Sequence, residues 1–143
     1  MLNHILLAVD GSPGSRKAAD FARRLVAGTP ARLTVLVVLE APTASVIPVL
    51  EGVAYTAPHP SAEELAVARD VMVEIEAALG HEHVVTRLDV GHPAEVVCSV
   101  AEELGVDLIV LGAHGGGGVA RWLIGSVGER VARHATRPVT VVR

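Results

Sequence analysis

The sequence predicts an α/β fold with a mostly parallel sheet, and three observations lead to this fold class. Five apolar segments alternate with helix-like segments along the chain, as in βαβ units. Half of the residues are hydrophobic but only 2% are aromatic, so a core must be built from Val, Leu, Ile and Ala. The 143 residues are close to the usual size of one domain, and we expect a single domain over 1–143.

The five expected strands differ in the pattern of their apolar side chains. Residues 4–9, 32–39 and 107–112 are nearly continuous in Leu, Ile and Val, which suits strands buried on both faces of a parallel sheet. Residues 84–90 instead alternate between apolar and polar side chains, which indicates a strand nearer an edge. The last strand is expected at 138–143.

Capping residues mark the helices between these strands. Ser12 is a favourable N-cap in front of the first helix. Ser61 and Glu64 have the spacing of a capping box before the second helix, and Gly80 is a favourable stop. The expected helices span 13–27, 62–79, 93–104 (stopped by Gly105) and 119–134.

One long segment, residues 41–61, fits neither pattern. It contains four prolines and several apolar residues without a clear period. Long segments without regular structure are uncommon, and they usually have a function or are disordered. A flexible insert, a lid and a docking surface remain open interpretations of this segment.

The charge balance and the N-terminal sequence exclude several classes of protein. The net charge of −4 is unfavourable for electrostatic binding to nucleic acid, and no apolar run is long enough to span a membrane. The N-terminus lacks the basic start of a signal peptide. Cys98 is the only cysteine, which fits a reducing compartment. We therefore expect a cytoplasmic protein whose partners are neither nucleic acid nor membrane.

Four consecutive glycines lie between the expected strand 107–112 and the last helix. In an open α/β sheet this is the carboxyl end of a strand, where ligands bind. Backbone N–H groups of a glycine-rich turn form an anion-binding concavity, and the next helix adds its positive N-terminus. The pattern indicates a phosphate site, with a flexible linker as the alternative. It is not a P-loop, because the required lysine is absent.

The chain resembles the universal stress protein family, and the glycines carry the most specific part of the resemblance. Gly112, Gly115, Gly125 and Ser126 have the spacing G-x2-G-x9-G-[ST] that marks the nucleotide-binding branch of that family. Three further stretches are similar to the family's opening strand and helix, its fourth strand, and its closing helix and strand. These stretches are "HILLAVDGSPGSRKAADFA", "VDLIVLGAHG" and "GSVGERVARHATRPVTVVR".

This resemblance implies a doubly wound, five-stranded parallel sheet with strand order 3-2-1-4-5, of the adenine-nucleotide α-hydrolase-like type. In that order the first and fourth strands are neighbours. Asp10 and the glycines from Gly112 onward would then face one crevice, where such sheets bind ligands. The resemblance also implies the ligand, which is ATP, with AMP and ADP as alternatives.

The same resemblance assigns residues to each part of the nucleotide. Ala8, Val9 and Asp10 would line the adenine end, and Val38 would offer its backbone to the base. Asp10 would lie near the nucleoside or ligate Mg²⁺, for which one carboxylate with phosphate oxygens and water is sufficient; alternatively, it is a turn or capping residue. The expected phosphate-binding residues are Gly112, Ala113, His114, Gly115, Gly116, Gly117, Gly118, Gly125, Ser126 and Val127.

Two departures from the family pattern weaken the expected phosphate site. Gly116 stands where the family often has Arg or Lys, and Gly128 stands where serine is common. Fewer side-chain donors would lower the affinity for phosphate unless Arg121 compensates, and Arg121 is equally well interpreted as an exposed helix residue. His114 is either a phosphate contact or a loop residue.

Other reactive residues favour no second site. His81 and His83 lie in a polar turn without an obvious third ligand for zinc. Cys98 lies in the expected third helix beside apolar residues, where a packed thiol is expected rather than a nucleophile.

Three functions remain open. The first is an ATP-binding protein that regulates a stress response, and the second is a slow ATPase or adenylyl-transferring enzyme that uses the same site. The third is a dimeric interaction module with no bound nucleotide. The missing lysine and the absence of a clear base argue against fast phosphoryl transfer.

The last strand, residues 138–143, is expected at a sheet edge. It is rich in valine and lacks the usual protection, with proline only at its start and arginine only at its end. Pairing with the same strand of a second copy would satisfy its backbone groups and form a two-fold homodimer. The family resemblance implies the same dimer.

Overall fold

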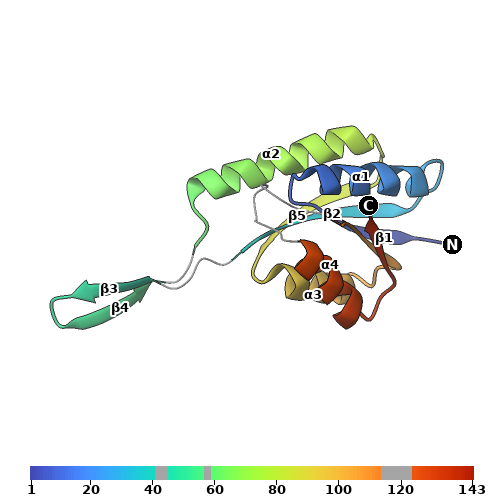
Figure 1. Cartoon of the computed structure of the whole chain (residues 1–143). Coiled ribbons are helices and arrows are strands. Elements are labelled where there is room, and N and C mark those ends of the chain that lie inside the picture. The colour runs from blue at the N-terminus through green and yellow to red at the C-terminus, as the bar shows by residue number, and fades with distance from the viewer. Residues whose placement is uncertain (41–44, 57–58, 114–123) are drawn as a thin grey trace.

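Five parallel strands form one sheet with helices on both faces (Figure 1). The computed structural model describes residues 1–40, 45–56, 59–113 and 124–143. In chain order, the elements are β1 (His4–Ala8), α1 (Pro13–Val26), β2 (Arg32–Leu39), β3 (Ser45–Val49), β4 (Gly52–Thr56), α2 (Ala62–Leu79), β5 (Val84–Val90), α3 (Pro93–Glu103), β6 (Leu108–Gly112), α4 (Ile124–His134) and β7 (Val139–Val142).

The strand order of the main sheet is β5-β2-β1-β6-β7, with every neighbouring pair parallel. Counted along the chain without the β3–β4 pair, this is the expected order 3-2-1-4-5, which is therefore confirmed. The chain builds the sheet outward from β1 through β2 to β5, and then returns to the other side of β1 for β6 and β7. The order therefore reverses between β1 and β6.

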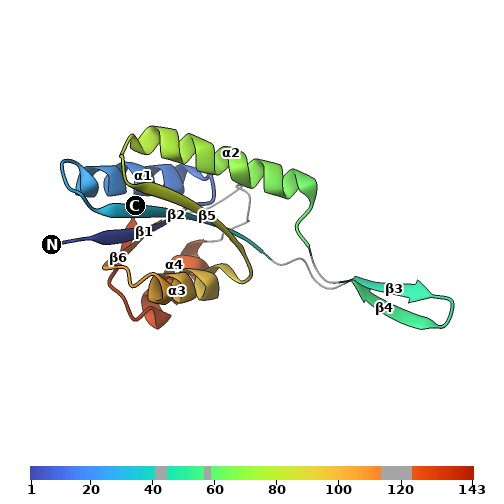
Figure 2. The same ribbon diagram turned by 180° about the vertical axis from the view of Figure 1, so that it is seen from behind.

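The near-continuous apolar strands are explained by two cores, one on each face of the sheet. Ile5 and Leu7 of β1 pack with α1 and α2, while Leu6 and Ala8 pack with α3 and α4. Figure 2 shows the same two layers from behind, with α1 and α2 above the strands and α3 and α4 below them. A strand buried on both faces needs apolar side chains at every position.

None of the described helices is long and apolar enough to cross a membrane.

The helix boundaries follow the local capping signals. Ser12 Oγ accepts the Ser15 N–H at 3.1 Å and caps α1. Ser61 Oγ accepts the Glu64 N–H at 3.1 Å, and the Glu64 carboxylate accepts the Ser61 N–H at 2.7 Å, which completes the capping box. Gly80 ends α2 at φ 53°. The expected residues 119–123 of the last helix lie outside the described part of the chain.

The expectation of an irregular segment at 41–61 is wrong for its middle part. There, β3 and β4 form an antiparallel hairpin in which Val49 pairs with Gly52. Its sequence shows no alternation because the described apolar side chains near its tip are exposed rather than packed on one face. Val49, Leu50 and Val53 are 50%, 107% and 57% exposed. Pro48 inside the run also argues against a strand in the sequence alone.

Candidate functional site

The carboxyl ends of β1 and β6 lie side by side at the point where the strand order reverses. The register pairs Ala8 with Leu111, so the residues that follow them leave the sheet at the same edge. Such a switch point is where doubly wound sheets bind ligands. We call the residues at this edge, Val9, Asp10, Val38, Gly112 and Ala113, the switch-point site.

Asp10 is the most unusual residue of the switch-point site, since this acidic residue is only 1% exposed. Oδ1 accepts the Ser12 N–H at 2.9 Å, which closes the turn before α1. Oδ2 is also buried, yet it accepts no hydrogen bond from the described part of the chain. Burying a carboxylate oxygen without a donor costs free energy. Asp10 therefore serves the turn with one oxygen, whereas its other oxygen is buried without a hydrogen-bond donor from the described residues.

The backbone of Val38 is directed toward the same edge. The N–H of Arg32 donates to Asn3 and the N–H of Val9 donates to Leu36, so even-numbered residues of β2 direct their backbone groups toward β1. Pairing between the two strands ends at Ala8 and Leu36, whereas β2 continues against β5 as far as Leu39. The Val38 N–H and C=O therefore point to the side of β1, beyond its last paired residue.

Gly112 has a packing role that the sequence analysis missed. A β-carbon at this position would lie 2.5 Å from the carbonyl carbon and oxygen of Gly14 and 3.0 Å from the Ser15 nitrogen. Only glycine lets the first turn of α1 approach the end of β6 this closely. The positive N-terminus of α1 is consequently beside the switch-point site. The close contact joins residues about a hundred positions apart, so no local pattern could reveal it.

The structure places only part of the expected phosphate site. Ala113 donates its N–H to the Val142 carbonyl at 2.6 Å, so this group is used by the sheet. Gly125 and Ser126 belong to the first turn of α4 by their backbone, and the Val127 side chain packs against the core shared with α3. The expected residues His114, Gly115, Gly116, Gly117, Gly118 and Arg121 lie outside the described residues.

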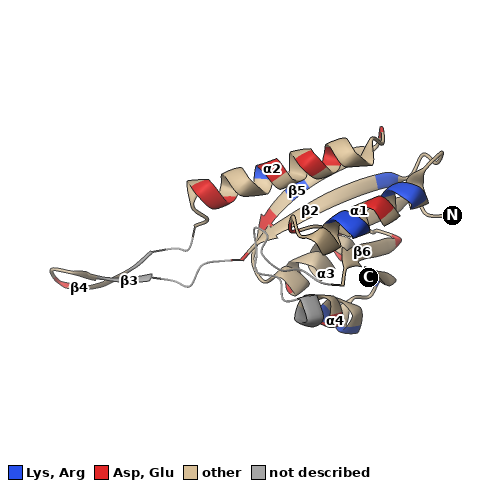
Figure 3. Cartoon of the chain, turned by 45° about the horizontal axis from the view of Figure 1, so that its top comes forward, with Lys and Arg blue, Asp and Glu red and all other residues tan. Residues whose placement is uncertain are grey.

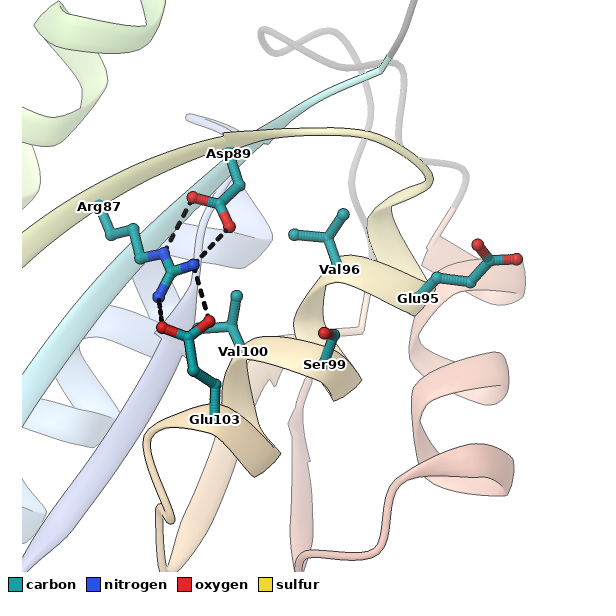
Figure 4. Close-up of a pocket in the computed structure, with 7 residues that line it drawn as sticks. All are labelled: Arg87, Asp89, Glu95, Val96, Ser99, Val100 and Glu103. Carbon is teal, nitrogen blue, oxygen red and sulfur yellow. Dashed lines mark hydrogen bonds and ion pairs between the residues drawn. The ribbon is translucent and has the colours of Figure 1, made fainter.

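A cavity of about 290 Å³ lies elsewhere, between β5 and α3 (Figure 4). Arg87 occupies it and forms hydrogen bonds with Asp89 at 2.9 Å and with Glu103 at 2.8 and 3.0 Å. Hydrogen bonds to Glu103 and Asp89 raise the pKa of Arg87, and Arg87 lowers the pKa of Glu103. Because its guanidinium is bonded to both carboxylates, Arg87 links β5 to α3 and does not form a binding site for an anion.

The remaining candidates from the sequence have structural partners. His81 Nε2 lies 2.7 Å from the Ala31 carbonyl oxygen, and the His81 and His83 rings meet edge to face at 5.8 Å. Cys98 is partly buried against the α3 and α4 core, and burial raises the pKa of its thiol. Among the described residues, no three His, Cys, Asp or Glu side chains are grouped to hold a metal ion.

Comparisons with known proteins agree on one family. The model of the universal stress protein family matches residues 1–143. A protein named as a universal stress protein in Staphylococcus haemolyticus is 36% identical over 145 residues, covering 98% of this chain and 84% of the relative. One from Staphylococcus aureus strain USA300 is 34% identical over 141 residues, with 98% and 83% covered.

Solved structures give the same result. The universal stress protein UspA from Lactobacillus plantarum has a TM-score of 0.76 and 28% identity, with 99% of this chain and 98% of that chain covered. A universal stress protein in complex with cAMP has a TM-score of 0.68 and 26% identity, with 99% and 97% covered.

Proposed function

Because this chain belongs to the universal stress protein family, we propose that it binds an adenine nucleotide, ATP, at the switch-point site. The observation that carries the proposal is the buried Oδ2 of Asp10, which has no donor from the described part of the chain. A nucleoside hydroxyl group would donate a hydrogen bond to Oδ2. Alternatively, a Mg²⁺ ion would be coordinated by this oxygen. One carboxylate, phosphate oxygens and water are sufficient ligands for Mg²⁺.

The backbone of Val38 would recognise the base. Its N–H and C=O offer one donor and one acceptor on the side of β1, and adenine presents complementary groups on its edge. The relative solved with cAMP, which is 26% identical, supports an adenine nucleotide as the ligand class. Recognition by backbone would tolerate the apolar side chains that β2 needs for its two cores.

The triphosphate would extend toward the first turn of α4. Gly125 and Ser126 lie in that turn, and a helix N-terminus offers backbone N–H groups and a positive dipole to phosphate. His114, Gly115, Gly116, Gly117 and Gly118, which precede it in the sequence, would complete the phosphate site. This part of the site would distinguish ATP from AMP or ADP.

The protein would act as a nucleotide-dependent regulator of a stress response, and it would act as a homodimer through β7. The N–H groups of Ile109 and Ala113 donate to Pro138 and Val142, so even-numbered residues of β7 bond to β6. The backbone groups of Val139 and Val141 therefore point outward, and Val141 is 39% exposed. The same strand of a second copy would satisfy them.

The test is direct measurement of the bound nucleotide. Purified protein is denatured, and the released material is identified by absorbance and mass. Calorimetry with nucleotide-free protein then compares ATP, AMP and cAMP in the presence and absence of Mg²⁺. We expect saturable binding of ATP to one site per chain, and an absence of heat with all three nucleotides would overturn the proposal.

A further inference from the structure

The β3–β4 hairpin has exposed apolar side chains and no sheet neighbour among the described residues. It forms a separate two-stranded sheet and lies away from the main sheet in both views (Figures 1 and 2). Val49, Leu50 and Val53 are at least half exposed. Figure 3 shows an acidic, red segment at the tip of the hairpin, and Glu51 is the only charged residue of 45–56. Because an isolated two-stranded hairpin is only marginally stable in water, this segment gains from a partner.

Only one of the two outer edges of the hairpin can donate hydrogen bonds continuously. The loop consists of Leu50 and Glu51, and in such a two-residue hairpin the flanking pair, Val49 and Gly52, exchanges backbone hydrogen bonds. The next pair, Pro48 and Val53, therefore directs its backbone outward. Proline has no N–H, so the β3 edge is interrupted, whereas the β4 edge remains complete.

The complementary edge in this chain is β5, which is one of the two edge strands of the main sheet, the other being β7. The Leu33 N–H donates to His83 and the Gly91 N–H donates to Leu39, so odd-numbered residues of β5 bond to β2. The outward backbone groups are those of Val84, Thr86, Leu88 and Val90.

The β5 edge lacks the features that usually prevent pairing. It contains no proline, and its two charged residues are held in ion pairs, since Arg87 lies 2.9 Å from Asp89 and 2.8 Å from Glu103. Val85 and Val90 are 52% and 45% exposed. A seven-residue edge with open backbone groups and exposed valines is expected to pair or to be covered.

We propose that β4 of one molecule adds to the β5 edge of a second copy of this chain. The hairpin follows β2, and β2 is the sheet neighbour of β5. The hairpin projects away from the main sheet (Figures 1 and 2), so two copies could exchange hairpins across a two-fold axis and close the assembly. The hairpin has one charged residue, Glu51, and the two charged residues of β5 are held in ion pairs, so no unpaired charge on β5 opposes the contact.

Photo-crosslinking with mixed isotopes tests the proposal on the full chain. Val53 is replaced by p-benzoylphenylalanine, and equal amounts of ¹⁵N-labelled and unlabelled protein are mixed before irradiation. We expect cross-linked peptides that join position 53 to residues 84–90 and contain one chain of each isotope. The same probe at Val73, which is 66% exposed on α2, is the control and should give no mixed-isotope link to β5.

Three results would overturn the proposal. Links found only within single isotopes would show that the hairpin folds onto its own chain, links to other segments would identify another acceptor, and the absence of links would show that the hairpin has no partner. A second variant pair probes the edge itself. Thr86→Pro removes an outward N–H and should lower the mixed-isotope yield by about tenfold, whereas Thr86→Val keeps that N–H and should preserve the yield.

Discussion

Gly112 at the end of β6 touches Gly14 in the first turn of α1 so closely that a β-carbon at 112 would lie 2.5 Å from the Gly14 carbonyl. The backbone atoms of β6 and α1 are held by the hydrogen bonds of the sheet and of the helix, so neither element can move without losing some of these bonds. Gly112 therefore holds the N-terminus of α1 beside the switch-point site.

We predict that Gly112→Ala lowers the free energy of unfolding by about 3 kcal/mol, because it overpacks a contact between backbones. Gly80→Ala is the matched control, since Gly80 has φ 53° but no atom within 4 Å of an added β-carbon. That variant should cost about 1 kcal/mol from the left-handed conformation alone. Urea unfolding measures both, and equal costs would show that the contact with Gly14 relaxes.

Asp10→Asn separates the two roles of Asp10. Asparagine keeps an acceptor for the Ser12 N–H but removes the charge from a buried oxygen without a described donor. We expect nucleotide-free protein to be as stable as wild type or more stable. Affinity for ATP should fall by about 10- to 100-fold, since a hydrogen bond to a charged group contributes about 1.5–3 kcal/mol.

The control for this prediction is Asp107→Asn, at the opposite end of the sheet. Asp107 Oδ2 accepts the N–H groups of Asn3 and His4 at 2.7 and 3.0 Å, and these bonds lower the pKa of its carboxyl group. Its replacement should change stability and leave ATP affinity unaltered. Calorimetry that gave equal losses for both variants would place the ligand elsewhere.

Local signals predicted the helices, whereas long-range geometry remained hidden in the sequence. Ser61, Glu64 and Gly80 give the bounds of α2 because a capping box and a left-handed stop depend on residues a few positions apart. The β3–β4 hairpin was not predicted because the apolar side chains near its tip are exposed, so its sequence lacks the alternation that marks a strand with one buried face. The open backbone of Val38 depends on where β1 ends relative to β2, which only the folded register reveals. The strand order came from the family resemblance.

Turnover distinguishes a binding protein from an enzyme. If the switch-point site holds ATP without a charge clamp for the transferred phosphoryl group, hydrolysis should be far below the common enzyme range of about 1–1,000 s⁻¹. Phosphate release under saturating ATP and Mg²⁺ measures it. A rate within that range that disappears in Asp10→Asn would establish the enzymatic alternative.

His4 makes the stability of the protein depend on pH. Its Nε2 lies 2.8 Å from the buried Thr34 Oγ1, and burial, followed by the charge of Arg32, lowers the pKa of His4. The unfolded chain, with a pKa of about 6.5, then takes up a proton before the folded chain does. The His4 contribution is therefore fully present above the unfolded value and is lost as pH falls below it.

We predict that the wild-type free energy of unfolding decreases between about pH 7.5 and 5.5, and that His4→Gln reduces this decrease. Urea titrations at several pH values provide the measurement. If the free energy of unfolding of His4→Gln depended on pH as in the wild type, groups other than His4 would cause the decrease.

The proposed homodimer depends on the outward backbone of β7. Even-numbered residues of β7 bond to β6, so the N–H of Val141 points away from the sheet. Val141→Pro removes that N–H without removing a bond to β6, and in a background that already carries Thr86→Pro it should convert a dimer into a monomer or an aggregate at micromolar concentration. Val141→Thr keeps the N–H and the β-branched shape, so it should remain dimeric.

Sedimentation velocity measures the outcome, and the β3–β4 hairpin must be considered at the same time. Two copies joined at β7 would leave both β5 edges free, so contacts at the two edges are independent and could build a larger assembly. Val141→Pro should therefore remove only the β7 contact, while Thr86→Pro should remove only the hairpin contact. A wild-type monomer, or a Val141→Pro variant that stays dimeric when Thr86→Pro is also present, would show that β7 is not the interface.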